Sequence, residues 1–245
     1  MRVAVLSDIH ANIQALDAIL AEVGSVDAVW HLGDVVGYGP DPDAVVNRLQ
    51  ERGAIGVQGN HDLAAIGDDA IRDFNVDARA AMEWTRRTIA SATRTWLEAL
   101  PTRLTMGSYS LVHGSPRDPT WEYILSESVA AANLAILATP HGLFGHTHLP
   151  VAYVLGGDRL DGAEVDSLTP QPGSTLGLAG RRALLNPGSV GQPRDGDPRA
   201  SALVLDVASH TVTWVRAAYD IEATQRAMRA AKLPPRGIAR LTFGI

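Results

Sequence analysis

The 245-residue sequence contains no cysteine, which excludes disulfide bonds and thiolate metal ligands. Any metal site must therefore use oxygen and nitrogen donors, and a cytoplasmic location is the expectation for a chain without disulfides. The sequence also lacks an apolar run of about 20 residues, the length that a membrane-spanning helix needs. Its apolar opening, residues 1–6, is too short for the apolar region of a signal peptide. We therefore expect no association with a membrane.

Stretches of positive charge are missing as well. The formal net charge is −6, and no long run of lysine or arginine occurs. General nucleic-acid binders present a basic surface to the phosphate backbone, so extended nucleic acid is not an expected partner. A local positive site, such as a bound cation, could still attract a small phosphorylated molecule to an acidic protein. No pattern in the sequence indicates an oligomeric state.

The chain is long enough to bury one large core or two small ones. Because no internal repeat and no linker marks a boundary, we expect a single domain over residues 1–245. Its first part alternates between apolar strands and amphipathic helices, with strands at 2–7, 28–32 and 54–57 and helices at 12–23 and from Pro42 to Gly53. This order predicts a largely parallel sheet whose loops gather at the carboxyl ends of the strands.

The middle of the chain reads as a helical insertion over about 63–100, with two helices near 78–90 and 93–100. This insertion could form a lid over a site, or it could pack as a helical pair on the sheet. The remaining predicted elements are a hairpin at 103–106 and 109–112, a helix at 126–138, strands at 151–155, 182–185, 202–207 and 211–217, a surface loop at 156–180, and a helix at 221–232 followed by an irregular tail.

The stretch His146-Thr147-His148 follows a short apolar run and is expected at the end of a strand. In extended chain, residues i and i+2 share a face with Cα atoms about 6.6 Å apart. Two bridged metal ions lie roughly 3.5–4 Å apart, so such a pair can give one nitrogen to each ion. An isolated His-x-His pair is more often two surface histidines in a loop. Whether this pair binds metal therefore depends on the other motifs in the sequence.

Four further clusters of polar residues also follow predicted strands. The five clusters are Asp8-x-His10, Gly33-Asp34, Gly59-Asn60-His61-Asp62, His113-Gly114 and Gly145-His146-Thr147-His148. Together they supply two carboxylates, one amide and four imidazoles, with His61 left over. This mixture of hard and borderline donors suits two divalent metal ions such as Mn²⁺, Zn²⁺ or Fe, with Mg²⁺ or Ni²⁺ also possible.

In this order and at strand ends, the five clusters resemble the motif series of the calcineurin-like metallophosphoesterase superfamily. The stretches 33–40 (GDVVGYGP), 113–116 (HGSP) and 186–189 (NPGS) resemble its small bacterial and archaeal phosphodiesterase/phosphatase branch. The resemblance covers nearly the whole chain. It implies an α+β (α/β) sandwich of two packed mixed β-sheets flanked by helices, with the metals at one edge.

The resemblance also implies a role for each cluster residue. The first metal would be held by Asp8, His10 and His148, and the second by Asn60, His113 and His146. Asp34 would bridge the two metals. His61 would bind no metal and would face the scissile phosphate, where it could protonate the leaving oxygen. Asp62 could orient His61, or it could be an ordinary loop carboxylate.

The implied activity is hydrolysis of a phosphodiester or small phosphorylated substrate by in-line attack of a metal-bridging hydroxide. A protein phosphatase and a dinucleoside polyphosphate hydrolase share the same core and remain alternatives. Outside the enzymes, the alternative function is a non-catalytic scaffold. The complete set of expected metal ligands argues against a scaffold. Candidate substrate contacts are Arg117, Arg194 and Tyr38, although each could be an ordinary solvated or packed side chain. We expect His31 to be structural and His141 and His210 to lie in loops.

Overall fold

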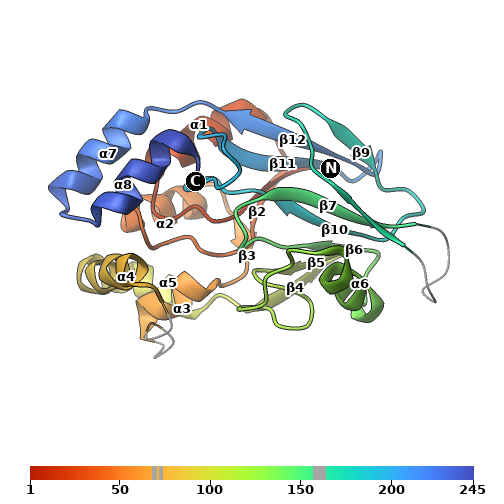
Figure 1. The fold of residues 1–245 in the computed structure, drawn as a ribbon, viewed down its shortest axis with the longest axis horizontal. Helices are drawn as coiled ribbons and strands as arrows, with labels where there is room; N and C mark the ends of the chain where they lie inside the picture. Colours follow the sequence, from red (N-terminus) through yellow and green to blue (C-terminus); the bar gives the residue numbers. More distant parts are fainter. Residues whose placement is uncertain (68–70, 72–73, 157–163) are drawn as a thin grey trace.

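Two six-stranded mixed sheets form the centre of the molecule, which is a computed structural model describing residues 1–67, 71, 74–156 and 164–245 (Figure 1). The first sheet has the order β3-β2-β1-β11-β12-β9. Its strands are β1 (Arg2–Leu6), β2 (Ala28–His31), β3 (Ile55–Gly56), β9 (Thr175–Gly177), β11 (Ala200–Asp206) and β12 (Thr211–Ala217). The second sheet has the order β4-β5-β6-β10-β7-β8. Its strands are β4 (Arg103–Met106), β5 (Tyr109–Val112), β6 (His141–Leu143), β7 (Pro150–Leu155), β8 (Val165–Leu168) and β10 (Ala183–Pro187).

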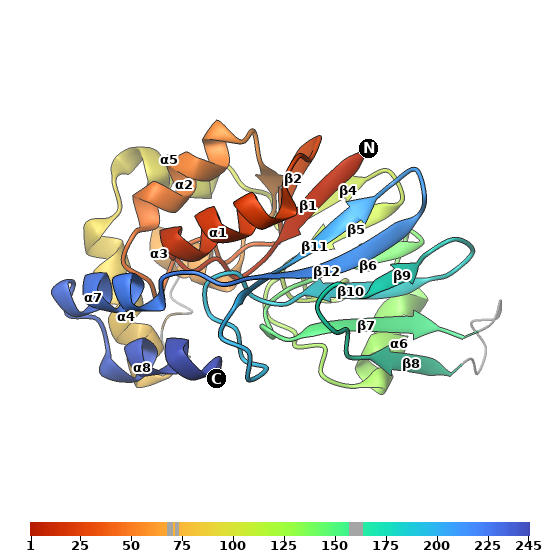
Figure 2. The same cartoon turned by 90° about the horizontal axis from the view of Figure 1, so that it is seen from above.

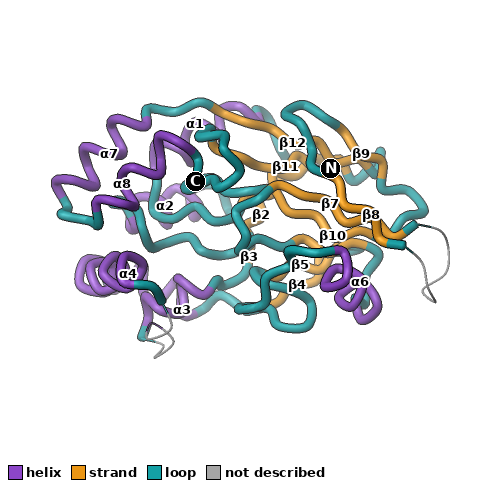
Figure 3. Tube along the Cα trace, viewed as in Figure 1, coloured by secondary structure: helices purple, strands orange, loops and turns teal. Residues whose placement is uncertain are grey.

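Helices cover the outer faces of the sheets and extend beyond one end of them. They are α1 (Ile13–Val23), α2 (Pro42–Glu51), α3 (Asn60–Ile66), α4 (Val76–Thr88), α5 (Ser91–Glu98), α6 (Glu127–Ile136), α7 (Ile221–Ala230) and α8 (Pro235–Phe243). In Figure 2, α1 lies over the first sheet and α6 lies on the side of the second. Helices α4, α7 and α8 gather beyond one end of the strands, as Figure 3 shows. This arrangement confirms the predicted sandwich of two mixed sheets flanked by helices.

Strand β1 shows why the sheets pack as they do. Val3 and Val5 belong to the apolar core between the two sheets, whereas Ala4 and Leu6 belong to the core beneath the helices. Alternate residues of a strand point to opposite faces, so a strand that is covered on both faces reads as a continuous apolar run. Leu16 of α1 packs into the second of these cores. The helix begins after Asn12, whose Oδ1 accepts a hydrogen bond from the Ala15 amide at 3.2 Å.

Each sheet contains a group of three parallel strands. In the first sheet β1, β2 and β3 run parallel, and in the second β5, β6 and β10 do so. The remaining pairs are antiparallel. The prediction of a largely parallel sheet therefore holds only for these groups. Every polar cluster of the sequence follows one of these parallel strands.

Most predicted elements are confirmed, and four predictions are wrong. Asn60 and His61 lie in the first turn of α3 and not in a loop. The expected loop at 156–180 contains β8 and β9, although 157–163 fall outside the described residues. The two edge strands escape pattern analysis because they are short and mostly exposed.

The expected irregular tail is helix α8 instead. Its Pro235 lies in the first helical turn, where proline is well tolerated, so this residue starts the helix and does not end one. Ile238 and Leu241 of α8 then pack on Met228 of α7. His141, expected in a loop, is buried in β6, whereas His210 lies in the predicted hairpin turn.

The helical insertion packs against the sheet through apolar residues. Met82 of α4 and Leu97 of α5 are fully buried in the same core as Leu16. Residues 68–70 and 72–73 of the insertion lie outside the described residues. A role of this segment as a lid stays a prediction. Across the part of the chain that the structure describes, no helix has the length and apolar character needed to cross a membrane.

Candidate metal centre

The polar clusters meet at one edge of the sandwich because the parallel strands end there. Asp8 and His10 follow β1, Asp34 follows β2, and Asn60 follows β3. His113 follows β5, and His146 and His148 follow β6. Backbone hydrogen bonds join neighbouring loops, for example from Asp8 N to Gly33 O at 3.1 Å and from His10 N to Asp34 O at 2.9 Å. All seven side chains are buried.

The backbone at these positions is unusual. Asp8, His10, Asp34, His146 and His148 all have φ between 49° and 66°. Left-handed backbone costs a residue with a side chain about 1–2 kcal/mol. Such strain tends to persist where the surrounding structure fixes it for a function.

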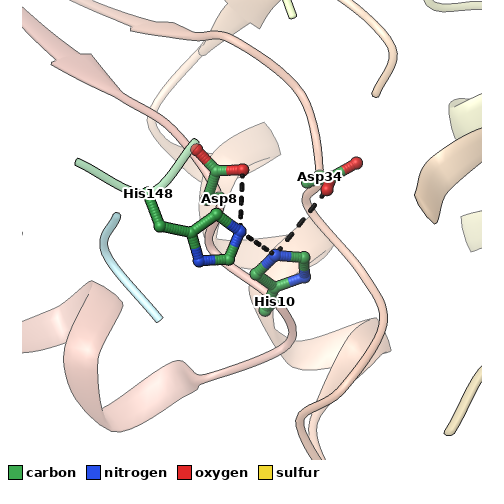
Figure 4. Close-up of side chains that lie close together, drawn as sticks. All are labelled: Asp8, His10, Asp34 and His148. Atoms are coloured by element: carbon green, nitrogen blue, oxygen red, sulfur yellow. Dashed lines mark hydrogen bonds and ion pairs between the residues drawn. The ribbon is translucent and has the colours of Figure 1, made fainter. Parts of the chain in front are cut away.

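Four side chains form what we call the first group, namely Asp8, His10, Asp34 and His148 (Figure 4). One ligand atom from each lies within 4.8 Å of all the others. The Nε2 atoms of His10 and His148 are 3.1 Å apart. His148 Nε2 is 3.3 Å from Asp8 Oδ1, and His10 Nε2 is 3.7 Å from Asp34 Oδ2.

A second group surrounds the other side of Asp34. His113 Nε2 lies 3.0 Å from His146 Nδ1 and 3.0 Å from Asn60 Oδ1. The same nitrogen lies 3.4 Å from Asp34 Oδ1. Asp34 therefore turns one carboxylate oxygen toward each group, which is the arrangement expected of a bridging ligand.

Hydrogen bonds to the backbone orient three of the imidazoles. The Nδ1 atoms of His10, His113 and His148 lie 3.2, 2.8 and 2.5 Å from the carbonyl oxygens of Val36, Leu32 and Gln192, respectively. A carbonyl oxygen can only accept, so Nδ1 carries the hydrogen, and in the neutral imidazole Nε2 has its lone pair toward the group. This is the tautomer that a histidine metal ligand needs.

The donors fit a cation better than they fit one another. The lone pairs of His10 and His148 face each other at 3.1 Å, a repulsive contact unless a positive charge lies between them. Asp8 Oδ1 is buried and has no hydrogen-bond partner among the residues that the structure describes. A buried carboxylate oxygen without a partner is costly. Both observations support metal binding at this position.

Burial and neighbouring charges shift the pKa values of the side chains in both groups. Burial lowers the pKa of His10 and His148 well below the usual histidine value. Burial, reinforced by His113, lowers that of His146 to about 3. Burial and the charge of Asp34 raise the pKa of Asp8 to about 7. Burial opposes the charged form of His113 too, but the neighbouring Asp34 outweighs it and raises the pKa to about 9.

Two glycines leave room for the ligands. A Cβ atom on Gly145 would lie 1.9 Å from Ser7 Oγ and 2.9 Å from Asp8 Oδ2. A Cβ atom on Gly59 would lie 2.2 Å from Asp34 Oδ1. Neither space could hold a side chain without displacing a carboxylate of the groups.

His61 lies beside the ligands without joining either group. Its backbone N–H donates to Asp34 Oδ1 at 2.9 Å, and its Nδ1 lies 3.1 Å from the Met82 sulfur. Its Nε2 has no hydrogen-bond partner among the described residues. The side chain lines a cavity of about 170 Å³ together with Asp34, Asn60, His146 and His148. Burial lowers the pKa of His61 to about 4, and Arg194 and His113 act in the same direction.

Asp62 does not orient His61, contrary to one of the two expectations. Its Oδ1 accepts from the Val36 amide and its Oδ2 from the Gly59 amide, both at 3.0 Å. Within the described residues it forms no hydrogen bond with the His61 ring. These two hydrogen bonds hold the loop after β2 and the start of α3 in place. Asp62 therefore fixes the backbone that carries side chains of the two groups. Burial and the charge of Asp34 raise its pKa to about 7.

The candidate substrate contacts divide into two kinds. Arg194, in the segment after β10, and Tyr38 both line the 170 Å³ cavity. Arg117 is not among the residues that line it, and its guanidinium forms an ion pair with Glu122. Sequence analysis missed Arg240 of α8, which also lines the cavity. Without knowledge of α8, no sequence signal could have placed it there.

His31 behaves as the structural histidine that was expected. It is fully buried in β2, and within the described part of the chain both of its ring nitrogens lack hydrogen-bond partners. Its ring centroid is 5.5 Å from that of Trp96. Burial alone lowers its pKa to about 4.

The chain is similar to known proteins of one family. Residues 1–210 match the model of the calcineurin-like phosphoesterase superfamily domain. The crystal structure of a metallophosphoesterase from Sphaerobacter thermophilus superposes with a TM-score of 0.90 at 42% identity, covering 100% of this chain and 99% of that one. A hypothetical protein from Pyrococcus horikoshii shares the fold, with a TM-score of 0.82 at 21% identity over 100% of this chain and 98% of that one.

A sequence relative extends over the same length. An uncharacterised protein of Methanocaldococcus jannaschii is 30% identical over 240 residues, which cover 95% of this chain and 93% of the relative. The family model, the neighbouring metallophosphoesterase and the buried groups of Asp and His side chains agree with one another. The chain is a metal-dependent phosphoester hydrolase, and it belongs to the calcineurin-like phosphoesterase superfamily.

Proposed function

We propose that the chain is a dinuclear enzyme that hydrolyses a phosphodiester or another small phosphorylated substrate. The observation that carries this proposal is the position of Asp34, whose two oxygens face two separate groups of donors. Asp8, His10 and His148 would hold one divalent ion, and Asn60, His113 and His146 would hold the other. The oxygen and nitrogen donors suit Mn²⁺, Zn²⁺ or Fe, and they also allow Mg²⁺ or Ni²⁺.

When bound, such ions polarise the phosphate and lower the pKa of bound water, so that the nucleophile forms near neutral pH. Two divalent charges against the carboxylates of Asp8 and Asp34 leave about +2 in the site. Asn60 contributes a ligand without a negative charge, which preserves this excess. The site can therefore attract a phosphate although the chain as a whole has a net charge of −6.

Two further side chains are placed to handle the substrate. The His61 side chain lines the cavity, and its Nε2, which has no hydrogen-bond partner among the described residues, could give a proton to the leaving oxygen. Its lowered pKa keeps it neutral near pH 7 in the free chain, whereas an anionic phosphate beside it favours the protonated form. Arg194 lines the same cavity and can hold a phosphate oxygen through its guanidinium.

The shape of the site supports a diester as the preferred substrate. The cavity at the metal centre shares lining residues with two others, of about 240 Å³ and about 360 Å³. Tyr38 and Asn75 line all three. A phosphate bound at the centre would therefore adjoin two further cavities for the two substituents of a diester, whereas a monoester would use only one.

The test is turnover of bis(4-nitrophenyl) phosphate against 4-nitrophenyl phosphate, each with added Mn²⁺ and each with a chelator. We expect metal-dependent hydrolysis that favours the diester. Preference for the monoester would turn the assignment toward a phosphatase. Absence of turnover with both metal ions demonstrably bound would contradict an enzymatic function with small esters and support a scaffold.

A further inference from the structure

An aromatic cavity adjoins the metal centre. The chain has few aromatic residues, with 5 Trp, 5 Tyr and 3 Phe. Four of them line the 240 Å³ cavity together with Asn60, His61 and His146, and they are Tyr38, Phe74, Trp121 and Tyr123. We call this cavity the aromatic pocket. Its lining includes ligands of the second group, so an occupant would lie directly beside the phosphate.

Two walls of the aromatic pocket come from different parts of the chain. Phe74, which precedes α4, lies 4.7 Å from His61 between ring centroids. Trp121 and Tyr123 belong to the segment between β5 and α6. The ring centroids of Trp121 and Phe74 are 6.3 Å apart, and Tyr123 stacks on His146 at 3.8 Å.

Two of these rings, Trp121 and Tyr123, are not part of the protein core. Trp121 is 36% exposed and Tyr123 is 48% exposed. The segment that carries them is nevertheless fixed. Glu122, between the two rings, pairs with Arg117 and accepts hydrogen bonds from Ser115 and Asn133. The bond from Arg117 lowers the pKa of Glu122 to about 2, with help from Ser115 and Asn133 against the effect of burial. Exposed aromatic side chains on such a braced segment lose little freedom when they bind a ligand.

The polar rim of the pocket favours a ring with hydrogen-bond acceptors. Asn75 lines the pocket, and its Oδ1 accepts from the Ala78 amide at 2.9 Å at the start of α4. Its amide NH₂ makes no hydrogen bond to any described residue, so it can donate to a ligand. An aliphatic group would leave this donor without a partner, whereas a heteroaromatic edge would accept from it.

We propose that the aromatic pocket binds a flat ring, either an aryl group or a nucleobase, that is part of the phosphoester substrate. This proposal rests on the proposed function, because it places the ester phosphate at the metal centre next to Asn60 and His146. Stacking of a base on an aromatic side chain is worth about 1–3 kcal/mol. Expressed as an affinity ratio, this corresponds to roughly 5- to 150-fold in favour of a ring-bearing ligand.

Phosphonates separate binding from hydrolysis. Phenylphosphonate and methylphosphonate have the same charged group, and neither is hydrolysed. We expect calorimetry on the Mn²⁺-loaded protein to show phenylphosphonate binding roughly 5- to 150-fold more tightly. In Trp121→Ala the ratio of the two affinities should fall toward one. In Trp121→Phe, which keeps a ring, phenylphosphonate should still bind more tightly, by most of the original factor. Leu125→Ala is the matched control, because Leu125 is 61% exposed on the same segment and does not line the pocket.

The possible results distinguish failure of the ring site from failure of the proposed function. Equal binding of the two phosphonates to the unaltered protein would overturn the aromatic pocket as a ring site. A phenyl preference that survives in both Trp121→Ala and Phe74→Ala would also overturn it. A phenyl preference that depends on Trp121, together with no hydrolysis of any ester, would leave the ring site standing and contradict the proposed function instead.

Discussion

The Nε2 atoms of His10 and His148 lie 3.1 Å apart, although the two residues are 138 positions apart in the sequence. Both imidazoles are turned by hydrogen bonds from Nδ1 to backbone carbonyls, so their lone pairs face each other. A cation between them would turn this repulsion into two coordination bonds.

Removal of divalent metal should destabilise the protein. A ligand that binds only the folded state at about 100 times its dissociation constant contributes about 2.7 kcal/mol. Scanning calorimetry with Mn²⁺ and with a chelator should therefore show a higher melting temperature in the presence of the metal. The His10→Ala variant, which loses one donor of the first group, should show a smaller difference. Equal melting temperatures with Mn²⁺ and with chelator would contradict metal binding at these groups.

Asp34→Asn should reduce the binding of both metal ions, because it removes a charge that faces both groups. Asp8→Asn is the matched comparison, since Asp8 belongs to the first group alone. Metal content per chain, measured by mass spectrometry after reconstitution and desalting, should fall further in Asp34→Asn than in Asp8→Asn. If the two variants lost the same amount, Asp34 would not be a bridge.

Gly145→Ala should damage the first group through steric overlap. The new Cβ would lie 1.9 Å from Ser7 Oγ and 2.9 Å from Asp8 Oδ2, so Ser7 or Asp8 must move. We expect lower Mn²⁺ affinity in a calorimetric titration. Gly177→Ala in β9 is the control, because its Cβ would meet no atom within 4 Å. Unchanged affinity in Gly145→Ala would show that the loop can shift without disturbing the ligands.

Much of this candidate centre could be predicted from the sequence, because each proposed ligand belongs to a short motif at the end of a predicted strand. Asp8, Asp34 and His113 each follow a strand that is apolar and buried, and such strands are the easiest elements to predict. The parallel order of those strands then brings their ends together. What sequence could not supply was the contact partner of each side chain, as Asp62 shows by bonding two backbone amides and not His61.

The substrate side of the site was less predictable for a different reason. Arg240 reaches the cavity from α8, a short helix that begins at the second of two prolines and whose apolar face is only a few residues wide. Trp121 and Phe74 line one pocket although 47 positions in the sequence separate them. Contacts of this kind depend on tertiary packing. Neither local propensity nor hydrophobic periodicity predicts which distant residues will meet.

His61→Ala should leave metal content unchanged and lower the turnover number by about 10²–10⁴, the usual contribution of a general acid. The hydrogen bond from His61 to Asp34 comes from its backbone amide, which the substitution retains, and its ring contacts that of His10 only at a ring-centroid distance of 4.9 Å. His61→Gln, which keeps a hydrogen-bonding side chain without an acid of suitable pKa, should be similarly slow. Loss of a metal ion in His61→Ala would show that the residue is a ligand and that its assigned role is wrong.

Acid should destabilise the protein partly through His31. Burial lowers the pKa of this residue from 6.5 to about 4 in the folded state. Between these two pH values the unfolded chain binds the proton and the folded chain does not, so the free energy of unfolding decreases as the pH falls through this window.

The variant His31→Leu removes this pH-dependent contribution to stability. Between pH 6.5 and pH 4.5 its loss of stability should therefore be smaller than that of the unaltered protein by about 2 kcal/mol. Urea denaturation at the two pH values measures the difference, and His210→Gln, in the hairpin turn, is the control. An equal loss in the unaltered protein and in His31→Leu would mean that His31 is protonated, or solvated, within the folded chain.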